Sequence, residues 1–279
     1  MKIIHYHDPH GAVGYAALQP DGSALKIEGD LFGRFKATKE LANVKKVVAP
    51  VAPSVFFCIG LNYRRHAEES GVAIPAFPVV FMKNPAAVLD PGDPILIPTK
   101  LKSTEVDYEC ELAVVIGKRC KNVSRDRALD YVLGYTCAND VSARDWQGRW
   151  GGSQWCRGKT FDTFAPIGPC LVTTNEITNP NTLGIKTVLN GQTMQDSNTA
   201  DMIFDVPTLI EFLSGSTTLL PGTVILTGTP SGVGGARKPP VFLKAGDTCT
   251  IEIEKIGALT NPINEEKLIG LTVKTEARR

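Results

Sequence analysis

The sequence has little of several features that define other classes of protein. Its 279 residues contain only four histidines, so a histidine-rich zinc site is not expected. No run of 18 apolar residues occurs, which excludes a typical transmembrane helix. Basic and acidic residues nearly cancel, 30 against 29, and the net charge of +1 does not indicate a partner such as nucleic acid or a membrane surface.

The cysteines also lack a pattern. There are seven, an odd number, and none forms a CxxC pair. This usage favours reduced thiols in the cytosol or a similar compartment. The first residues contain neither an apolar signal core nor an arginine-rich leader, so we expect a cytoplasmic protein. A mature organellar form whose leader has been removed stays open.

The chain is long enough for one principal domain with a smaller appendage. Residues 1–53 alternate apolar and polar positions around Pro20-Asp21-Gly22-Ser23, which predicts a small N-terminal β region with a turn. This region ends in a proline-punctuated connection at residues 47–53. Residues 54–279 are then expected to form the main domain.

Short apolar runs separated by glycine and proline predict strands at residues 112–116, 223–226 and 248–253. The dipeptide Asn190-Gly191 between two such runs is typical of a β-hairpin. Helical patterns are fewer and lie at about residues 62–69, 125–133 and 207–213. The inventory indicates a β-rich α+β fold without internal repeats.

An acidic stretch runs directly into an apolar strand at residues 106–117. Glu109 and Glu111 are two apart, so on a strand they share a face, with Asp107 above them. Adjacent carboxylates repel unless a proton or a cation lies between them, and oxygen ligands suit Mg²⁺, Mn²⁺ or Ca²⁺. The alternative is that both carboxylates lie on the wet face of an amphipathic strand.

A second polar cluster, residues 138–147, follows an apolar run at an expected strand end. Asp140 could complete a set of three carboxylates. Arg144 and Gln147 offer a guanidinium group and an amide for a substrate carboxylate or carbonyl. The alternative is a solvated loop in which aspartate and arginine pair locally.

Two further positions are candidates for proton transfer. Lys159 stands among small and apolar residues, where an ammonium group needs an anionic partner, although most lysines are simply exposed. His66 lies three residues before Glu69, one helical turn away, so the carboxylate could orient the ring. Glu68 would point elsewhere on that helix, and an exposed histidine on a polar helix is the alternative.

A glycine-rich loop ends the strand at residues 225–234. Its hydroxyl groups and free backbone N–H groups could receive a carboxylate or an oxyanion. It lacks the lysine and the spacing of a phosphate-binding loop, and a plain tight turn is the alternative.

Together these segments resemble the fumarylacetoacetate hydrolase superfamily from about Phe57 to Gly257. The order of the blocks carries the resemblance, which is more specific than any one of them. The matching blocks are Ile59-Gly60-Leu61-Asn62-Tyr63 with His66, Phe81-Met82-Lys83, Asp107 to Leu112, Asn139 to Gln147, Gly158 to Asp162, and Leu226 to Pro230.

The resemblance implies a mixed β-sandwich roll catalytic domain (a fumarylacetoacetase C-terminal-like fold), usually found as a homodimer. It also implies one Mg²⁺ or Mn²⁺ ion per subunit, with Glu109, Glu111 and Asp140 as ligands. Lys159 would lie beside the bound substrate, and His66 with Glu69 on a lid over it. Implied substrate contacts are Lys83, Arg144, Gln147 and Thr229.

The sequences of residues 142–147 and 238–244 resemble most those of the fumarylacetoacetate hydrolase domain-containing protein 2 branch. This resemblance implies oxaloacetate keto–enol tautomerase activity. Neighbouring branches decarboxylate oxaloacetate, hydrolyse C–C bonds of acylpyruvates or isomerise dienedioates, and all of these reactions pass through an enolate held on the metal. Fumarylacetoacetate hydrolase itself has a further aspartate ligand just after its Ile-Gly, where this chain has Leu61-Asn62. This difference points away from fumarylacetoacetate as the substrate.

Two other interpretations stay open at this point. One is an isomerase or decarboxylase of secondary metabolism that acts on a larger β-keto acid. The other is a catalytically idle scaffold that binds metal and keeps the fold. Loss of Lys159, His66 or a metal ligand would favour the scaffold, and all of them are present.

Overall fold

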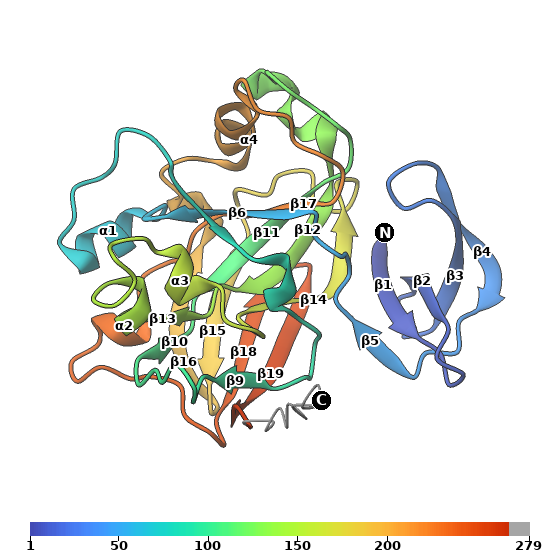
Figure 1. Ribbon diagram of the computed structural model, residues 1–279. Coiled ribbons are helices and arrows are strands. Elements are labelled where there is room, and N and C mark those ends of the chain that lie inside the picture. The colour runs from blue at the N-terminus through green and yellow to red at the C-terminus, as the bar shows by residue number, and fades with distance from the viewer. Residues whose placement is uncertain (268–279) are drawn as a thin grey trace, which may run out of the picture.

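Strands dominate the structure, a computed structural model that describes residues 1–267 (Figure 1). Residues 268–279 of the expected main domain lie outside this range. In chain order the strands are β1 Lys2–His7, β2 Val13–Leu18, β3 Ala24–Gly29, β4 Phe35–Leu41, β5 Lys46–Val48, β6 Val55–Gly60, β7 Val79–Lys83, β8 Val88–Leu89, β9 Ile95–Ile97, β10 Val106–Asp107, β11 Cys110–Ile116, β12 Val132–Asn139, β13 Ser142–Ala143, β14 Ala165–Thr173, β15 Gly184–Leu189, β16 Gln192–Asn198, β17 Thr223–Leu226, β18 Thr248–Ile253 and β19 Gly257–Glu265.

Helices are short by comparison. The α-helices are α1 Arg64–Ser70, α2 Arg144–Gln147, α3 Cys156–Lys159 and α4 Val206–Ser214, and the 3₁₀ turns are η1 Pro85–Ala87, η2 Arg125–Tyr131, η3 Thr199–Asp201 and η4 Gly234–Ala236. In Figure 1, α1, α2 and α3 lie together on the side of the body away from the N-terminal strands. The β-rich α+β class expected from the sequence is confirmed.

The larger sheet of the described chain has twelve strands, ordered β4-β3-β2-β1-β14-β12-β11-β17-β6-β7, with β5 beside β1 and β8 beside β14. The N-terminal strands form a lobe beside the main body (Figure 1). They join the body through β1, whose residues Lys2 and Ile3 pair with Val172 and Leu171 of β14. The turn expected at residues 20–23 links β2 and β3 as a hairpin, with Gly22 at a φ of 84°.

The central strand β11 is buried on both faces, which explains its continuous apolar run. Leu112 and Val114 pack in one core, and Ala113 and Val115 in the other. A strand enclosed in this way has no wet face, so apolar side chains are favoured at successive positions.

A second sheet, with strand order β16-β15-β18-β19-β9, packs over β11, β12 and β14 and completes the roll. Its first hairpin turns at Asn190 and Gly191, with φ angles of 51° and 80°. Both residues are thus left-handed, as in a type I′ turn, and the hairpin prediction is confirmed.

The helix predictions at 62–69 and 207–213 correspond to α1 and α4. The prediction at 125–133 is wrong in type, because residues 125–131 form a 3₁₀ turn and β12 begins at Val132. No helix within residues 1–267 is long and apolar enough to cross a membrane.

Candidate metal centre and active site

Three buried carboxylates meet where β11 begins and β12 ends. In this antiparallel pair Cys110 lies opposite Asn139, and the backbone N–H of Asp140 donates to the carbonyl of Glu109 at 2.9 Å. Carboxylate oxygens of Glu109, Glu111 and Asp140 all lie within 4.8 Å of one another. The pairing of two strands therefore assembles the set that the sequence predicted.

Two buried lysines compensate part of this negative charge. Lys159 at the end of α3 donates to Glu109 Oε2 at 2.6 Å and to Asp140 Oδ2 at 2.8 Å. Lys83 at the end of β7 donates to Asp140 Oδ1 at 2.5 Å. Burial opposes the charge of Lys159, but Asp140 and Glu109 outweigh it and raise the pKa of this ammonium group. Lys159 is therefore charged at neutral pH.

The carboxylates differ in how far they are compensated. Burial raises the pKa of Glu109, but Lys159 and Arg144 outweigh burial and bring that pKa down to about 2. For Glu111, burial is followed by repulsion from Asp140 and Glu109, and its pKa lies well above the usual value.

Glu111 accepts a hydrogen bond from the backbone N–H of Gly228 at 2.7 Å. Within residues 1–267 no lysine, arginine or histidine forms an ion pair with it. Three hard oxygen donors, one of them lacking a cation, are a set that fits a divalent ion such as Mg²⁺ or Mn²⁺.

Arg144, the first residue of α2, joins this centre to a fourth buried acid. Its Nη1 lies 2.7 Å from Glu109 Oε1 and its Nη2 lies 2.8 Å from Asp107 Oδ2. Nη1 also donates to Gln147 Oε1 at 3.0 Å. Asp107 additionally accepts backbone hydrogen bonds from Gly234 at 2.8 Å and Gly235 at 2.9 Å. Asp107 thus fixes Arg144 against the glycine-rich loop.

Helix α1 brings His66 and Glu69 together. The Nδ1 atom of His66 lies 3.2 Å from Glu69 Oε2, and both oxygens of Glu69 accept from the backbone N–H of Gly232 at 3.0 and 3.1 Å. Burial raises the pKa of Glu69, but these hydrogen bonds outweigh it and lower the pKa. Gly71 ends α1 in the left-handed conformation, so the chain turns away directly after this pair.

The glycine-rich loop contributes Thr229, whose hydroxyl accepts from Gln195 Nε2 at 2.8 Å. Gly228 before it has a φ of 97°, and a Cβ there would lie 2.7 Å from the Cβ of Asn62. The positive φ and the close approach to Asn62 both require glycine at position 228. They also place the Gly228 N–H against Glu111.

Between α1 and the carboxylates lies a cavity of about 220 Å³. Its walls include most of the side chains predicted from the sequence. The lining residues are Ile59, Gly60, Leu61, His66, Ser70, Val72, Phe81, Glu109, Glu111, Arg144, Gln147, Trp155, Lys159 and Thr229.

Lys83 lies elsewhere than expected for a substrate contact. Its ammonium group is enclosed behind Asp140, where it also donates to the carbonyl of Val141 at 3.0 Å, and it is not part of the cavity wall. Asp140 is likewise behind the wall, with its two oxygens held by the two lysines.

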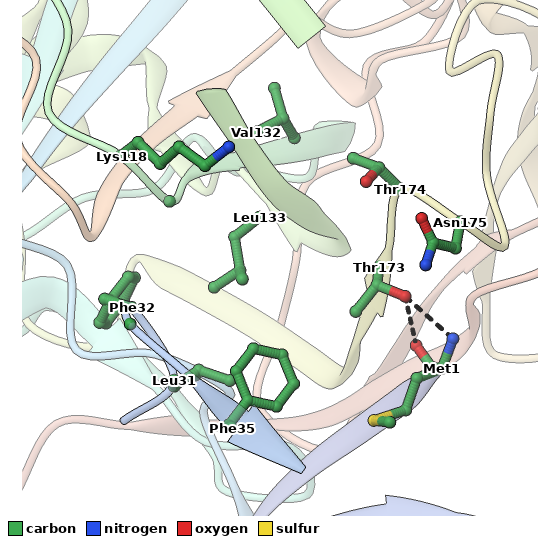
Figure 2. Close-up of a pocket in the computed structure, with 12 residues that line it drawn as sticks. Met1, Leu31, Phe32, Phe35, Lys118, Val132, Leu133, Thr173, Thr174 and Asn175 are labelled. Carbon is green, nitrogen blue, oxygen red and sulfur yellow. Dashed lines mark hydrogen bonds between the residues drawn. The ribbon is translucent and has the colours of Figure 1, made fainter. Parts of the chain in front are cut away.

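A larger cavity of about 330 Å³ lies between the N-terminal lobe and β14 (Figure 2). Its walls are mainly apolar, with Leu31, Phe35 and Leu133 facing the space, and Lys118 is its only charged side chain. Because its lining has no carboxylate, histidine or cysteine, this cavity lacks the side chains that most often hold a metal ion or transfer a proton.

Some residues of the site had no clear signal in the sequence. Asp107 was noted only for its place on the strand, because its contact with residues 234–235 spans more than a hundred positions. Trp155 and Gln195 lie in segments without a recognisable motif. Asn62 is buried and donates to the carbonyls of Phe204 and Thr227, so it supports the loops instead of facing the carboxylates.

Comparison with known proteins agrees with this geometry. The profile described as fumarylacetoacetate (FAA) hydrolase C-terminal matches residues 55–264. A Dictyostelium discoideum protein, fumarylacetoacetate hydrolase domain-containing protein 2 homolog, is 53% identical over 78% of this chain and 74% of its own length. A protein of Xenopus laevis named as a mitochondrial oxaloacetate tautomerase is 47% identical over 90% of this chain and 76% of its own length.

Solved structures give the same result. The 2-hydroxyhepta-2,4-diene-1,7-dioate isomerase of Mycobacterium marinum is 39% identical with a TM-score of 0.81, covering 95% of this chain and 99% of that one. A fumarylacetoacetate hydrolase from Exiguobacterium antarcticum is 32% identical with a TM-score of 0.85, covering 95% of this chain and 100% of that one. This chain therefore belongs to the fumarylacetoacetate hydrolase family and is an enzyme.

Proposed function

We propose that this enzyme is an oxaloacetate keto–enol tautomerase that depends on one Mg²⁺ or Mn²⁺ ion per subunit. The observation that carries the proposal is the set of three buried carboxylates beneath a cavity of only about 220 Å³. Such a cavity is below the usual range for larger ligands, about 300–1,000 Å³, and suits a small 2-oxo acid. The Xenopus laevis relative, 47% identical, carries the same activity in its name.

The divalent ion, when bound by Glu109, Glu111 and Asp140, would supply Lewis-acid stabilisation of the negative charge that forms on the oxygen at C2 of the substrate. Lys159 supports the same charge from the side. Its ammonium group has three N–H donors, and two of them contact Glu109 and Asp140 in the described chain. The third is left for a substrate oxygen in the cavity that Lys159 lines.

His66 is the group we assign to proton transfer at C3. An Nδ1–H that donates to Glu69 leaves the Nε2 lone pair free. In the keto-to-enol direction Nε2 takes a proton from C3 and then gives it up, directly or through water, to the oxygen at C2. The reverse direction moves the same proton from that oxygen back to C3 through Nε2. No other reactant is needed for this isomerisation.

Arg144 and Gln147 are assigned to a carboxylate of the substrate. Both line the cavity, and Asp107 holds the guanidinium group from behind. Asp107, Glu109 and Gln147 engage Nε, Nη1 and one side of Nη2. The donors left for a substrate carboxylate are one N–H of Arg144 Nη2 and the amide N–H groups of Gln147.

A second candidate is hydrolysis of a C–C bond in an acylpyruvate. The His66–Glu69 pair favours it, because the same Nε2 atom could take a proton from a water molecule. Decarboxylation of oxaloacetate, or isomerisation or decarboxylation of a larger β-keto acid, would use the same carboxylates. The idle scaffold has no support, since the relatives are named as tautomerases, isomerases and hydrolases.

A homodimer also remains a proposal. Strand β7 ends the order of the large sheet, and its side chains Val80 and Met82 are 38% and 42% exposed, near Phe77 at 71%. An apolar sheet edge of this kind favours an interface. Sedimentation equilibrium of the full chain measures the mass, and a monomer at all concentrations would contradict the dimer.

The compartment is a proposal as well. Cysteine usage favours a reducing compartment, and within the described chain all seven cysteines are free. The Xenopus laevis and human relatives are named mitochondrial, which keeps the organellar alternative beside the cytoplasmic one. Fractionation of the source cells, with detection of the native protein, distinguishes the two.

The proposed activity is tested by adding metal-stripped protein to enol-oxaloacetate, with and without Mg²⁺ or Mn²⁺. Enol absorbance and pyruvate are followed in parallel, and protein-free samples correct for catalysis by the ions alone. Metal-dependent enol loss without pyruvate supports the tautomerase, and equal pyruvate release would mean a decarboxylase. If neither rate exceeds the protein-free control, the assignment fails, and acylpyruvates become the next substrates to test.

A further inference from the structure

Trp155 lines the cavity and has no role in the chemistry above. It directly precedes α3 and has helical backbone angles, φ −61° and ψ −31°. Lys159 follows four residues later, so both side chains lie on the same face of this turn. Both line the cavity. Trp155 is therefore one helical turn away from the group that contacts the carboxylates.

The indole ring is held firmly in this position. A Cβ atom added to Gly60 would lie 2.3 Å from Cζ3 of Trp155, so the ring lies directly against the backbone at the end of β6. Phe81 of β7 packs against it edge-to-face, with ring centres 5.6 Å apart. Phe81 is also 4.9 Å from the Lys159 ammonium group. Two rings and a glycine from β6, β7 and the start of α3 thus form one continuous part of the cavity wall.

The spacing between Trp155 and Lys159 along α3 can be compared with the length of a substrate. Four residues at a rise of 1.5 Å separate the Cα atoms of Trp155 and Lys159 by about 6 Å along the helix. Their side chains contact the same Phe81 ring, 5.6 Å from the indole centre and 4.9 Å from the ammonium group. In an extended chain each bond advances roughly 1.2 Å. In a four-carbon 2-oxo diacid the far oxygen lies three bonds beyond C2, about 3.6 Å, and in a seven-carbon diacid it lies six bonds beyond, about 7 Å.

From this geometry, and resting on the proposed function, we infer that Trp155 determines specificity by limiting the length of the substrate. A four-carbon 2-oxo diacid fits between the carboxylate centre and the indole. A six- or seven-carbon diacid meets the ring and Gly60. The site therefore selects short diacids over the longer acids that other members of the family accept according to their names.

The test measures binding, so it does not depend on turnover. Calorimetry with Mg²⁺-loaded protein gives dissociation constants for 2-oxo diacids of four, five, six and seven carbons. The proteins are wild type, Trp155→Ala, Trp155→Phe and Trp150→Ala. Trp150 belongs to the same loop, is 53% exposed and lies outside the cavity wall, so its variant controls for loss of a tryptophan. Trp155→Phe keeps a ring if the alanine variant does not fold.

Wild type and Trp150→Ala are expected to bind the seven-carbon acid at least about ten-fold more weakly than the four-carbon acid. Trp155→Ala should remove most of this difference, and Trp155→Phe should give an intermediate value. Equal length profiles in wild type and both Trp155 variants would overturn the inference. If the length profiles are equal but wild type still tautomerises oxaloacetate, the proposed function stands and only the inference about Trp155 fails. If wild type binds no four-carbon acid, the inference and the proposed function both fail.

Discussion

Among the three carboxylates of this centre, Glu111 has the least compensation from neighbouring cations. Burial and the neighbouring carboxylates Asp140 and Glu109 raise its pKa, whereas Glu109 has Lys159 and Arg144 beside it. A folded protein without metal therefore keeps a proton on Glu111 that the unfolded chain releases. Since the folded state binds more protons, this residue lowers stability as pH rises from its usual pKa of 4.5 toward the higher pKa of the folded state.

We predict that Glu111→Gln makes the metal-stripped protein more stable at neutral pH. The same variant should weaken metal binding by about 100-fold or more, which exceeds the usual loss when a residue that only contacts a metal ligand is changed. The variant should lose less stability than wild type as pH rises above about 4.5, the usual pKa of the glutamate side chain. Thermal unfolding with a chelator and with Mn²⁺ measures both effects. Glu28→Gln, at an exposed position, serves as control. A variant that binds Mn²⁺ as wild type does would contradict the ligand assignment.

Asn62→Asp changes the second residue of Leu61-Asn62, the pair that stands where fumarylacetoacetate hydrolase has its additional aspartate. Asn62 is fully buried, and its amide donates to two backbone carbonyls. A carboxylate there would face those carbonyls without a donor, so we expect a loss of about 1–3 kcal/mol or more in the free energy of unfolding. Urea denaturation measures it, with exposed Asn264→Asp as control. Unchanged stability together with tighter metal binding would show that this residue can act as a ligand.

For individual residues, the sequence identified the side chains of the site better than it identified the groups that contact them. The spacing of Glu109 and Glu111 was informative, because strand geometry alone places them on one face. Lys83 was expected at the substrate, but its place behind Asp140 depends on how β7 reaches the end of β12. Asp107 was equally hidden, since its partners lie in a distant loop.

At the scale of elements, α1 and the glycine-rich loop form one unit through Glu69. Its carboxylate contacts His66 on the same helix and the N–H of Gly232 in the glycine-rich loop. The helix is short, and its only fully buried residue is Ala67, so few packing contacts hold it. The orientation of His66 depends on this contact.

Glu69→Gln keeps an oxygen that can accept from Gly232 but removes the charge beside His66. We expect kcat to fall by about 10- to 100-fold, with KM and Mn²⁺ affinity nearly unchanged. Steady-state kinetics and a metal titration measure the three quantities. Glu68→Gln on the exposed side of α1 is the matched control and should behave as wild type. Equal effects of both variants would assign the loss to the helix and not to the His66–Glu69 pair.

Elements were predictable where one local rule decided them. The doubly buried strands gave continuous apolar runs, and Asn190-Gly191 gave the hairpin. The segment 125–131 became a 3₁₀ turn because the chain must enter β12 at Val132, a tertiary requirement that helical periodicity does not contain. The pairing order of the strands was likewise beyond local rules.

At the scale of the whole molecule, the proposed boundary near residue 53 does not separate the lobe from the sheet. Strand β1 pairs with β14, and fully buried Ile3 packs in the same core as Leu171. We therefore propose that residues 1–53 form a structural region that unfolds together with the main domain.

Ile3→Ala should then lower the free energy of unfolding of the whole chain by about 2–5 kcal/mol. Urea unfolding followed by tryptophan fluorescence measures this, because all three tryptophans lie at residues 146–155 in the main domain. Val13→Ala on β2, 57% exposed, is the control. A lower midpoint by circular dichroism with an unchanged fluorescence midpoint would instead indicate a lobe that unfolds separately.

The central claim is that Glu109, Glu111 and Asp140 hold a divalent ion on which oxaloacetate tautomerisation depends. The most direct measurement is a titration of Mn²⁺ into metal-stripped wild type and Glu109→Ala, with the initial rate of enol-oxaloacetate loss as readout. The account predicts a saturable rise for wild type and no rise above the protein-free ion for Glu109→Ala. A wild-type rate that is independent of Mn²⁺, or an equal rise in the variant, would contradict it.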